Sequence, residues 1–359
     1  MGNLQLCVML QNYSWVVFFA FFLNCSLANN SSDKFIIQLD NDLFFNRDQD
    51  YTSGLRIAHI REFQSLPKTL NRLQNWLQPM TGADSESPFD RFRIEGKAPL
   101  RYSWGTGITQ LMFTPADHDA LTPLSGERPY AGWLGFECSL HAKTNRTVSS
   151  VTLTLGTTGK NSFAQSSQDW VHKNISKSPL FKGWSSQVPS EITLNLFFDH
   201  KRALIQASFA EDLPIEIDGY LEWGAAFGNF KTNAYIGSMI RIGHNLKSSY
   251  STPRVQVGSY AHELFQKEDP NQTPFSIYGF LGGRASAVLH DITLNGPIFR
   301  DYKYQVKTKP LIGELVTGCG ISWNQLELSF SHTFRSREFR GQNESHSFGS
   351  VLLRFVLPF

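Results

Sequence analysis

Two short stretches of the sequence carry the residue types best suited to chemistry. Gln168-Asp-Trp-Val-His172 supplies an imidazole and, four residues before it, an amide. Residues four apart share a face on a helix and also on a strand, so Gln168 and His172 are expected on one side of their element. Near the N-terminus, Leu39-Asp-Asn41-Asp42-Leu43 supplies amide and carboxylate oxygens. An imidazole suits proton transfer, and a set of oxygens suits a hard cation.

The oxygen-bearing residues lie at and beside a predicted hairpin turn over residues 46–53. Asn41 and Asp42 lie near the end of the first predicted strand, and Thr52 begins the second. The hairpin would gather further polar side chains around them: Gln38, Asp40, Asp48, Asp50 and Ser53. Such a set predicts a Ca²⁺ site. The alternative is that the acidic turn residues are simply solvated.

A compact basic element follows in Arg128-Pro-Tyr-Ala-Gly132. The planar guanidinium of arginine suits a phosphate group, and Lys160 and Lys173 could join Arg128 around one. The alternative is an ordinary surface turn that leads into a strand.

The elements that must position these residues alternate in polarity with a period of two, which is typical of strands. Residues 63–98 instead show helical spacing between Leu66 and Leu77, which predicts a loop with a short amphipathic helix. Tight turns are predicted at 199–201 and at Gly318, with longer loops at the other end, as in transmembrane barrels. The predicted fold is an all-β, antiparallel transmembrane barrel of about twelve strands with a short helical loop. Candidate strands cover 34–39, 55–60, 101–111, 133–141, 149–155, 192–198, 204–209, 215–227, 235–242, 254–260, 276–281, 285–289, 311–317, 321–334 and 350–357.

Composition and the N-terminus agree with an exported barrel. The chain has 359 residues and a formal net charge of +2, with no basic stripe that could neutralise nucleic-acid phosphates. Residues 1–28 contain an apolar run and end in Ser26-Leu-Ala28, which predicts a cleaved signal peptide and leaves 29–359 as the barrel. The alternative is an uncleaved anchor helix, but the apolar run is shorter than the roughly 20 residues that a spanning helix needs.

The mature chain keeps two cysteines, Cys138 and Cys319. Each lies in a strand-like run, so we expect two packed thiols, with a bridge only if their strands are neighbours. The sequence contains no HExxH, CxxC, G-x-S-x-G or P-loop motif.

Taken together, these stretches give a specific resemblance. The chain resembles the outer-membrane lipid A 3′-O-deacylase family in motif order over nearly the whole mature sequence. The matching stretches are Asp40-Asn-Asp-Leu-Phe44, Asp48-Gln-Asp-Tyr-Thr-Ser-Gly54, Phe113-Thr-Pro115, Arg128-Pro-Tyr-Ala-Gly-Trp133, Gln168-Asp-Trp-Val-His172, Gly183-Trp-Ser-Ser-Gln187, Gly228-Asn-Phe-Lys-Thr232, Leu281-Gly-Gly-Arg284, Arg337-Glu-Phe-Arg-Gly-Gln342 and the terminal Phe359.

The resemblance implies a twelve-stranded barrel whose site lies between the lumen and the outer leaflet. It implies that His172 activates water, that Asn41, Asp42 and Thr52 belong to a calcium-dependent site, and that Gln168 and Arg128 support the site and the substrate phosphate. The implied substrate is lipid A of lipopolysaccharide. The C-terminal strand, which ends in an aromatic residue, resembles those recognised by the barrel-assembly machinery of the bacterial outer membrane.

One departure from the family pattern concerns an acidic residue. The family has an essential glutamate shortly after its histidine, whereas His172 is followed by Lys-Asn-Ile-Ser-Lys-Ser-Pro179. The first glutamate downstream is Glu191. An inactive or porin-like barrel is therefore an alternative, as is an outer-membrane phospholipase, although no H-x-S pattern occurs. An adhesin-like barrel would need long surface loops, and the only long segments predicted are 63–98 and 157–189.

Overall fold

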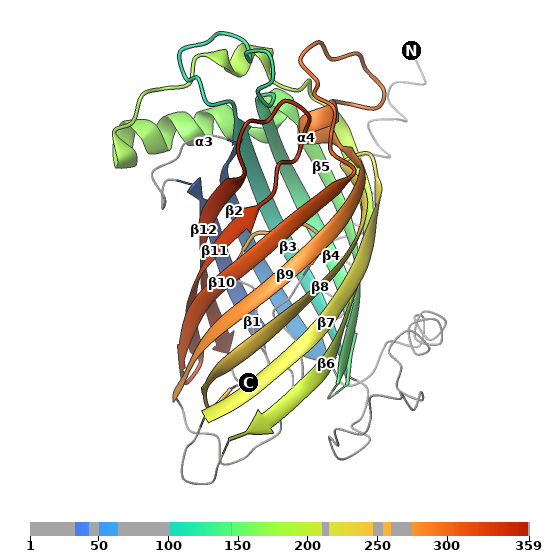
Figure 1. The fold of residues 1–359 in the computed structure, drawn as a ribbon, viewed down its shortest axis with the longest axis vertical. Helices are drawn as coiled ribbons and strands as arrows, with labels where there is room; N and C mark the ends of the chain where they lie inside the picture. The colour runs from blue at the N-terminus through green and yellow to red at the C-terminus, as the bar shows by residue number, and fades with distance from the viewer. Residues whose placement is uncertain are drawn as a thin grey trace, which may run out of the picture.

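Twelve antiparallel strands close into a barrel (Figure 1), which confirms the predicted fold class. The computed structural model describes residues 33–42, 50–63, 101–144, 146–209, 215–246, 254–259 and 275–357. Consecutive strands pair with each other and β1 pairs with β12, so no sheet edge stays open. The strands are β1 (Asp33–Asn41), β2 (Asp50–Phe63), β3 (Arg101–Thr114), β4 (Ala131–Lys143), β5 (Thr147–Thr158), β6 (Ile192–Ser208), β7 (Ile215–Gly228), β8 (Lys231–His244), β9 (Phe275–Asp291), β10 (Leu311–Trp323), β11 (Leu326–Arg335) and β12 (His346–Leu357).

The strands carry apolar side chains outward and polar side chains inward. In β1, Phe35, Ile37 and Leu39 are 45%, 46% and 40% exposed, whereas Gln38 and Asp40 between them are buried. Because successive side chains on a strand point to opposite faces, this pattern assigns the exposed positions to the outer wall. An apolar outer band around a polar interior is typical of barrels that sit in a membrane.

Ion pairs fill much of the lumen. Arg56 of β2 donates from Nη2 to both carboxylate oxygens of Glu137 on β4, at 2.9 Å each, and both side chains are fully buried. Such pairs satisfy buried charges that would otherwise be costly to remove from water. The barrel interior is therefore a packed polar core and not simply a water-filled channel.

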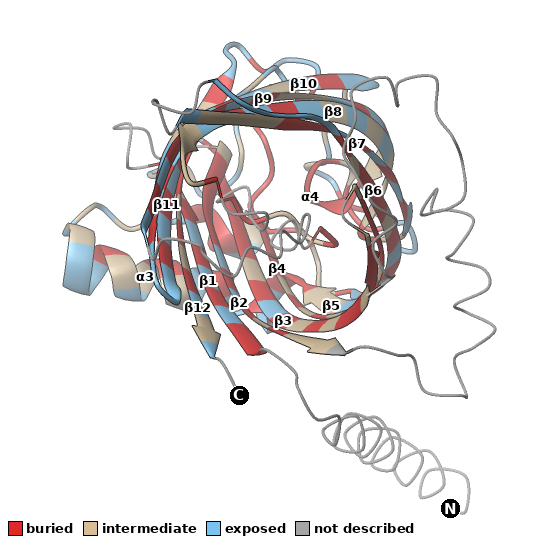
Figure 2. Ribbon diagram, turned by 90° about the horizontal axis from the view of Figure 1, so that it is seen from below, coloured by how far each residue is buried: buried red, intermediate tan, exposed pale blue. Residues whose placement is uncertain are grey.

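The strand connections lie at two ends. Those that follow the odd-numbered strands lie at one end, together with η4 (Gly159–Ser162), α3 (Ala164–Val171), the π-helix η5 (His172–Ser176), η6 (Gly183–Ser186) and α4 (Ile292–Asn295). We call this the α3 end. In Figure 2, α3 lies outside the ring of strands, whereas α4 lies within its outline.

The structure corrects several strand boundaries. The turns predicted at 199–201 and Gly318 are wrong, because both lie inside strands, β6 and β10. The stretches 192–198 and 204–208 fall in one strand, which ends one residue before the predicted boundary at 209. The stretches 276–281 and 285–289 also share one strand, whereas 321–334 is divided by a turn at Asn324 and Gln325. Short connections occur at both ends, at 229–230 and at 324–325, so the expected asymmetry of the two ends is wrong as well.

The largest correction concerns residues 254–260, predicted as a strand. Residues 254–259 are not a strand, and they contact lumen-facing side chains of several strands. Within the described residues, Cys138 and Cys319 are both free thiols, and Cys319 is exposed where a packed thiol was predicted. No described helix is long and apolar enough to cross a membrane. The predicted signal peptide (1–28), the helix within 63–98, Asp48 and Phe359 lie outside the described residues.

Candidate functional site on the outer wall

The candidate site is built on a row of outward positions near the α3 end of β1 to β4. Register pairs Asn41 with Ser53, Ser53 with Met112, and Met112 with Gly132. Directly opposed residues on neighbouring strands point to the same face of a sheet. Asn41 has the same parity as the exposed residues of β1, so all four positions face outward. We call Asn41, Ser53, Met112 and Gly132 the wall row.

The segment that carries His172 approaches this row at Gly132, and its helix α3 lies outside the ring of strands (Figure 2). A Cβ atom on Gly132 would lie 2.1 Å from Ser162 Oγ and 2.4 Å from Ala164 Cβ, so only glycine permits this close approach. Gln110 of β3 also faces outward and donates from Nε2 to the carbonyl of Ser162 at 2.6 Å. The start of α3 is thereby fixed to the wall.

Aromatic side chains fill the space between the wall and the α3 segment. Met112 of the wall row belongs to a buried cluster with Tyr130, Ala164, Phe181 and Trp184. The Tyr130 ring lies 5.3 Å from the Trp184 ring, centroid to centroid, and burial raises the pKa of Tyr130 to about 12. The hydroxyl of Tyr130 therefore stays protonated and belongs to the packing of the site.

His172 lies at the junction of α3 and the π-helix η5 and is buried. Its Nδ1 lies 2.6 Å from the carbonyl oxygen of Pro179, and its ring packs edge-on against Phe181. A carbonyl oxygen can only accept, so Nδ1 carries a proton and the neutral ring has its lone pair on Nε2. The contact thus selects the tautomer and the orientation that a general base requires.

Gln168, one turn before His172, is oriented in the same way. Its Oε1 accepts a hydrogen bond from Trp184 Nε1 at 2.8 Å. Because an indole only donates, the amide oxygen must face Trp184 and the amide nitrogen must point away. That Nε2 is buried and has no hydrogen-bond partner among the described residues. Buried donors normally have an acceptor, so this nitrogen is available to a ligand or water.

The oxygen-bearing residues lie at the α3 ends of β1 and β2. β2 has a bulge between Tyr51 and Ser53, which leaves Thr52 as the extra residue, and its Oγ1 lies 2.7 Å from Thr114 Oγ1. Asn41 ends β1 in the wall row, and the fully buried Asp42 follows it. Bulges often occur beside active sites because they re-aim a side chain. The structure therefore brings Asn41, Asp42 and Thr52 together at the adjoining ends of β1 and β2, where Asn41 and Ser53 begin the wall row that continues to Gly132 beside the His172 segment.

Unusual backbone conformations flank this region. Asp50, Phe163 and Lys177 are three of the five described non-glycine residues with positive φ, at 68°, 57° and 57°. Each costs free energy that surrounding contacts must offset, and such residues concentrate at functional sites. They bound the three segments that carry Thr52, Gln168 and His172.

The remaining predicted residues lie in different surroundings. Arg128 is buried, donates to Glu338 Oε2 and Thr293 Oγ1 at 3.3 Å each, and covers the Phe113 ring. It also lines a rim cavity of about 300 Å³ with the carboxylates of Asp50, Glu127 and Glu344. Phosphate binding by Arg128 stays a prediction, and these carboxylates would oppose it.

Lys173 is the last of the predicted site residues, and Glu191 is the first glutamate downstream of His172. Lys173 is exposed on η5, directly after His172. Glu191 is held at the start of β6, where its Oε1 accepts from Asn229 Nδ2 at 2.9 Å and its backbone N–H donates to Thr158. These contacts tie Glu191 to the ends of β5 and β7.

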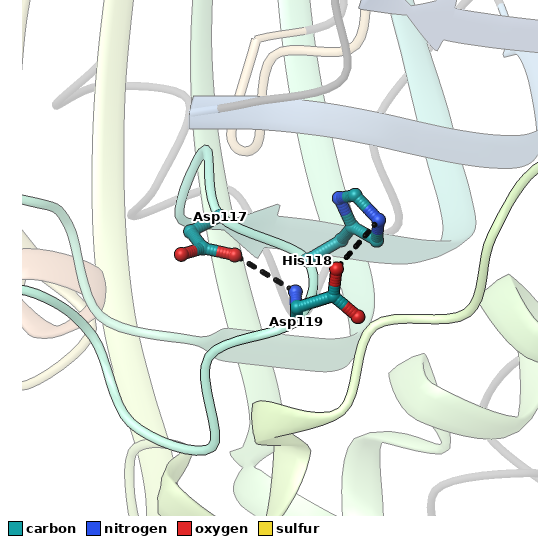
Figure 3. Close-up of side chains that lie close together, drawn as sticks. All are labelled: Asp117, His118 and Asp119. Atoms are coloured by element: carbon teal, nitrogen blue, oxygen red, sulfur yellow. Dashed lines mark hydrogen bonds and ion pairs between the residues drawn. The ribbon is translucent and has the colours of Figure 1, made fainter.

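A cluster of possible metal ligands lies in the β3–β4 connection (Figure 3). Ligand atoms of Asp117, His118 and Asp119 lie within 4.8 Å of one another. However, Lys182 Nζ lies 2.6 Å from Asp119 Oδ1, and this hydrogen bond lowers the pKa of Asp119. The backbone N–H of Lys182 also donates to the His118 carbonyl. The cluster therefore fastens the segment after His172 to the β3–β4 connection and is already supplied with a cation.

Sequence reasoning missed the residues that orient the site. Trp184 and Thr114 lie in stretches that matched the family, but no role was predicted for them. Pro179 acts through its backbone carbonyl, which no side-chain pattern could indicate. The one usable signal was Trp184, whose indole can only donate and which follows Gln168 by 16 residues.

The fold and the site together define an outer-membrane type of β-barrel whose polar site lies on the outside of its wall. The chain belongs to the family described as outer membrane protein LpxR, whose family model matches residues 15–357. It is therefore an outer-membrane protein.

One solved structure shows a similar barrel, and others superpose less well. LpxR from Salmonella typhimurium superposes with a TM-score of 0.66 at 15% identity, covering 90% of this chain and 99% of that one. The β-domain of the Bordetella autotransporter BrkA gives 0.40 at 8% identity, covering 91% and 98%. The transport unit of the autotransporter AIDA-I from Escherichia coli gives 0.39 at 8% identity, covering 93% and 91%. No curated protein sequence matches the chain.

Proposed function

We propose that this protein is a lipid A 3′-O-deacylase, a calcium-dependent carboxylic-ester hydrolase of the bacterial outer membrane. Membership of the LpxR family supports the substrate class. The observation that carries the proposal is the orientation of His172, whose Nδ1 is engaged by the Pro179 carbonyl at 2.6 Å. A buried imidazole with a fixed tautomer on the outer wall is placed to meet an ester that lies in the membrane.

His172 acts as a general base in this proposal. Nε2 takes a proton from water, the hydroxide oxygen bonds to the acyl carbon, and the ester C–O bond breaks. The imidazolium then returns its proton to the sugar oxygen that leaves, which gives a free fatty acid and a free hydroxyl. General-base catalysis typically contributes roughly 10²- to 10⁴-fold to the rate. The Pro179 carbonyl stabilises the transient imidazolium through its hydrogen bond.

The polar residues around His172 bind and orient the substrate. Gln168 offers a buried amide donor with no partner among the described residues to an acceptor oxygen of the substrate. Lys173, exposed beside His172, offers a positive charge to a lipid A phosphate, and Arg128 supports the region from within through Glu338. The aromatic cluster of Tyr130, Phe181 and Trp184 excludes water from behind.

The residues that would hold calcium are Asn41, Asp42 and Thr52. Their amide, carboxylate and hydroxyl oxygens suit this hard cation, and the single carboxylate indicates a weak site that substrate or water oxygens complete. Ca²⁺ bound there would supply Lewis-acid polarisation of the ester carbonyl.

The proposal also covers export. Residues 1–28 are a signal peptide that is removed, and residues 29–359 are inserted into the outer membrane by the barrel-assembly machinery. N-terminal sequencing of the protein isolated from outer membranes tests the cleavage site.

Mass spectrometry of lipid A tests the activity. Incubation with the refolded protein and Ca²⁺ is expected to remove an acyl chain, and a chelator is expected to prevent it. His172→Gln and Asp42→Ala should each reduce the rate by at least roughly 10²-fold, since each removes a central group of the site. The folded state is checked by the heat-dependent shift of the barrel on gels. If lipid A stays unchanged with the native protein as well as with both variants, the proposal is overturned. Cleavage of phospholipid instead would point to a phospholipase.

A further inference from the structure

A segment of the β8–β9 connection lies inside the barrel. We call residues 254–259 the lumenal strap. Its backbone and side chains bond to residues of β1, β2, β4, β6 and β10, and its two valines belong to or pack against the largest buried apolar cluster. The strap donates hydrogen bonds from the Val255 N–H to Asp40, from the Gly258 N–H to Glu137 and from Arg254 Nη1 to Glu314. It accepts hydrogen bonds at the Arg254 carbonyl from Gln38 Nε2, at the carbonyls of Gln256 and Ser259 from Arg56, and at Ser259 Oγ from Lys201 Nζ.

The strap is bonded to β1 through Asp40. The N–H of Val255 donates to both carboxylate oxygens of Asp40, at 2.9 Å each. Tyr51 Oη donates to the same carboxylate at 3.0 Å. Asp40 is fully buried, so these donors replace the water that the carboxylate has lost. One buried group thus connects the strap, the end of β1 and the start of β2.

Tyr51 is fixed in this position by its surroundings. Its hydroxyl lies where a Cβ atom on Gly54 would stand, at 2.0 Å, so glycine is required for the ring to cross the strand. The ring also packs against Phe113 and Phe348, with centroids 5.2 and 4.8 Å away. The tyrosine and glycine of the Asp-Tyr-Thr-Ser-Gly54 stretch therefore serve the contact with Asp40.

The residues held from the lumen immediately precede residues of the site. Asn41 follows Asp40, and Thr52 follows Tyr51. Adjacent residues on a strand point to opposite faces, so a contact made inside fixes the direction of the neighbour outside. Asp40 also faces Gly54 in the register of β1 and β2, which places the link beside the bulge at Thr52.

We propose that the lumenal strap, Asp40 and Tyr51 form a positioning device for the calcium-binding oxygens of Asn41, Asp42 and Thr52. The strap holds Asp40, Asp40 holds Tyr51, and this chain of buried contacts sets the relative position of the two strand ends. This inference rests on the proposed function, because it assigns a purpose to the geometry of that same site. None of the three is a catalytic residue, since all act from the opposite side of the wall.

Calcium dependence tests the device. Tyr51→Phe removes only the hydroxyl that reaches Asp40 and keeps the ring in its aromatic packing. We expect the calcium concentration for half-maximal activity to rise roughly tenfold or more, as for partners of metal ligands in general. Saturating calcium should restore most of the rate. Luminescence of Tb³⁺ in place of Ca²⁺ should show the same weakening without any substrate.

Tyr220→Phe is the matched control. Tyr220 is also a buried lumenal tyrosine, but its hydroxyl contacts the sulfur of Met239, at 3.7 Å, and its ring belongs to a separate apolar cluster. It should leave the calcium dependence unchanged. Equal calcium curves for Tyr51→Phe and the native protein would overturn the proposal, as would a loss that saturating calcium does not restore.

A separate measurement distinguishes failure of the device from failure of the proposed function. If the native protein proves inactive or independent of calcium, amide hydrogen exchange at residues 40–42 and 51–53 still reports on the strand ends. Faster exchange in Tyr51→Phe than in Tyr220→Phe supports positioning by the strap. Equal exchange in both variants contradicts it.

Discussion

Gln168 and His172 are each oriented by a group that can only donate or only accept a hydrogen bond. The Trp184 indole can only donate and therefore sets the amide of Gln168, while the Pro179 carbonyl can only accept and therefore sets the tautomer of His172. Both orienting groups come from the segment that follows His172 in the chain. A short stretch of sequence thus supplies the functional groups and also the contacts that direct them.

Trp184→Phe tests this at the residue scale. The change removes the indole N–H but keeps a ring against Tyr130, so Gln168 loses its fixed orientation without a large cavity. One neutral hydrogen bond is worth about 1 kcal/mol, so we expect deacylation to slow by roughly 2- to 10-fold. The initial rate on lipid A micelles measures it. Trp323→Phe, on the exposed outer wall of β10, should leave the rate unchanged; equal rates in both variants would argue against a role for the indole.

Residue types predicted the candidates but not their partners. The imidazole, the amide and the oxygen set were recognisable at Gln168, His172, Asn41 and Asp42 because their chemistry is local to the sequence. The Val255 amide that holds Asp40 comes from more than two hundred positions away. Asp40 itself was predicted with the metal-site oxygens, whereas it bonds to the strap inside the barrel. No spacing rule could have indicated a contact of that separation.

At the element scale, α3 is held by packing and not by its own helical tendency. It has only eight residues, its N-cap side chain makes no hydrogen bond, and its first turn has no acidic residue. Isolated helices of this length are unstable in water. The close contact between Gly132 and the start of α3 therefore decides where Gln168 and His172 lie.

Gly132→Ala should displace α3 from the wall. The added Cβ would lie within 2.5 Å of both Ser162 and Ala164, and these atoms belong to the segment and not to a flexible tip. A shift on the order of 1 Å at the reacting groups costs roughly 10- to 100-fold in rate, with the barrel still folded because Gly132 faces outward. Gly279→Ala is the control, because its nearest neighbour would be 3.8 Å away. Full activity of Gly132→Ala would show that the contact at Gly132 does not position Gln168 and His172.

The strand errors have a common physical cause at this scale. Asp199 and Lys201 suggested a turn because polar runs usually face water, yet both side chains pair with each other inside the lumen. Gly318 suggested a turn, but its missing side chain makes room for Phe280 and the backbone of β11. In a barrel with a polar interior, polar and glycine residues belong to strand centres as well as to turns.

The whole molecule is a closed barrel whose interior is occupied. The strap crosses the lumen where Arg56, Glu137 and Lys201 are all buried, and it leaves a cavity of about 130 Å³ near the α3 end. Arg254 of the strap and Arg335 of β11 both form ion pairs with Glu314 of β10. This arrangement argues against a passive pore.

Measurement of ion conductance distinguishes a barrel with a filled lumen from a passive pore. In planar bilayers the native protein should show no steady open-pore current, because the strap and the ion pairs fill the cross-section. Replacing residues 254–259 by six Gly and Ser residues removes the Arg254, Val255 and Val257 contacts and leaves Arg56 and Glu137 facing an emptied lumen. We expect this variant to conduct, and to need more calcium for deacylation, since the same strap holds Asp40. A steady current through the native protein would show that the strap does not close the barrel, and the porin-like interpretation would then regain its place.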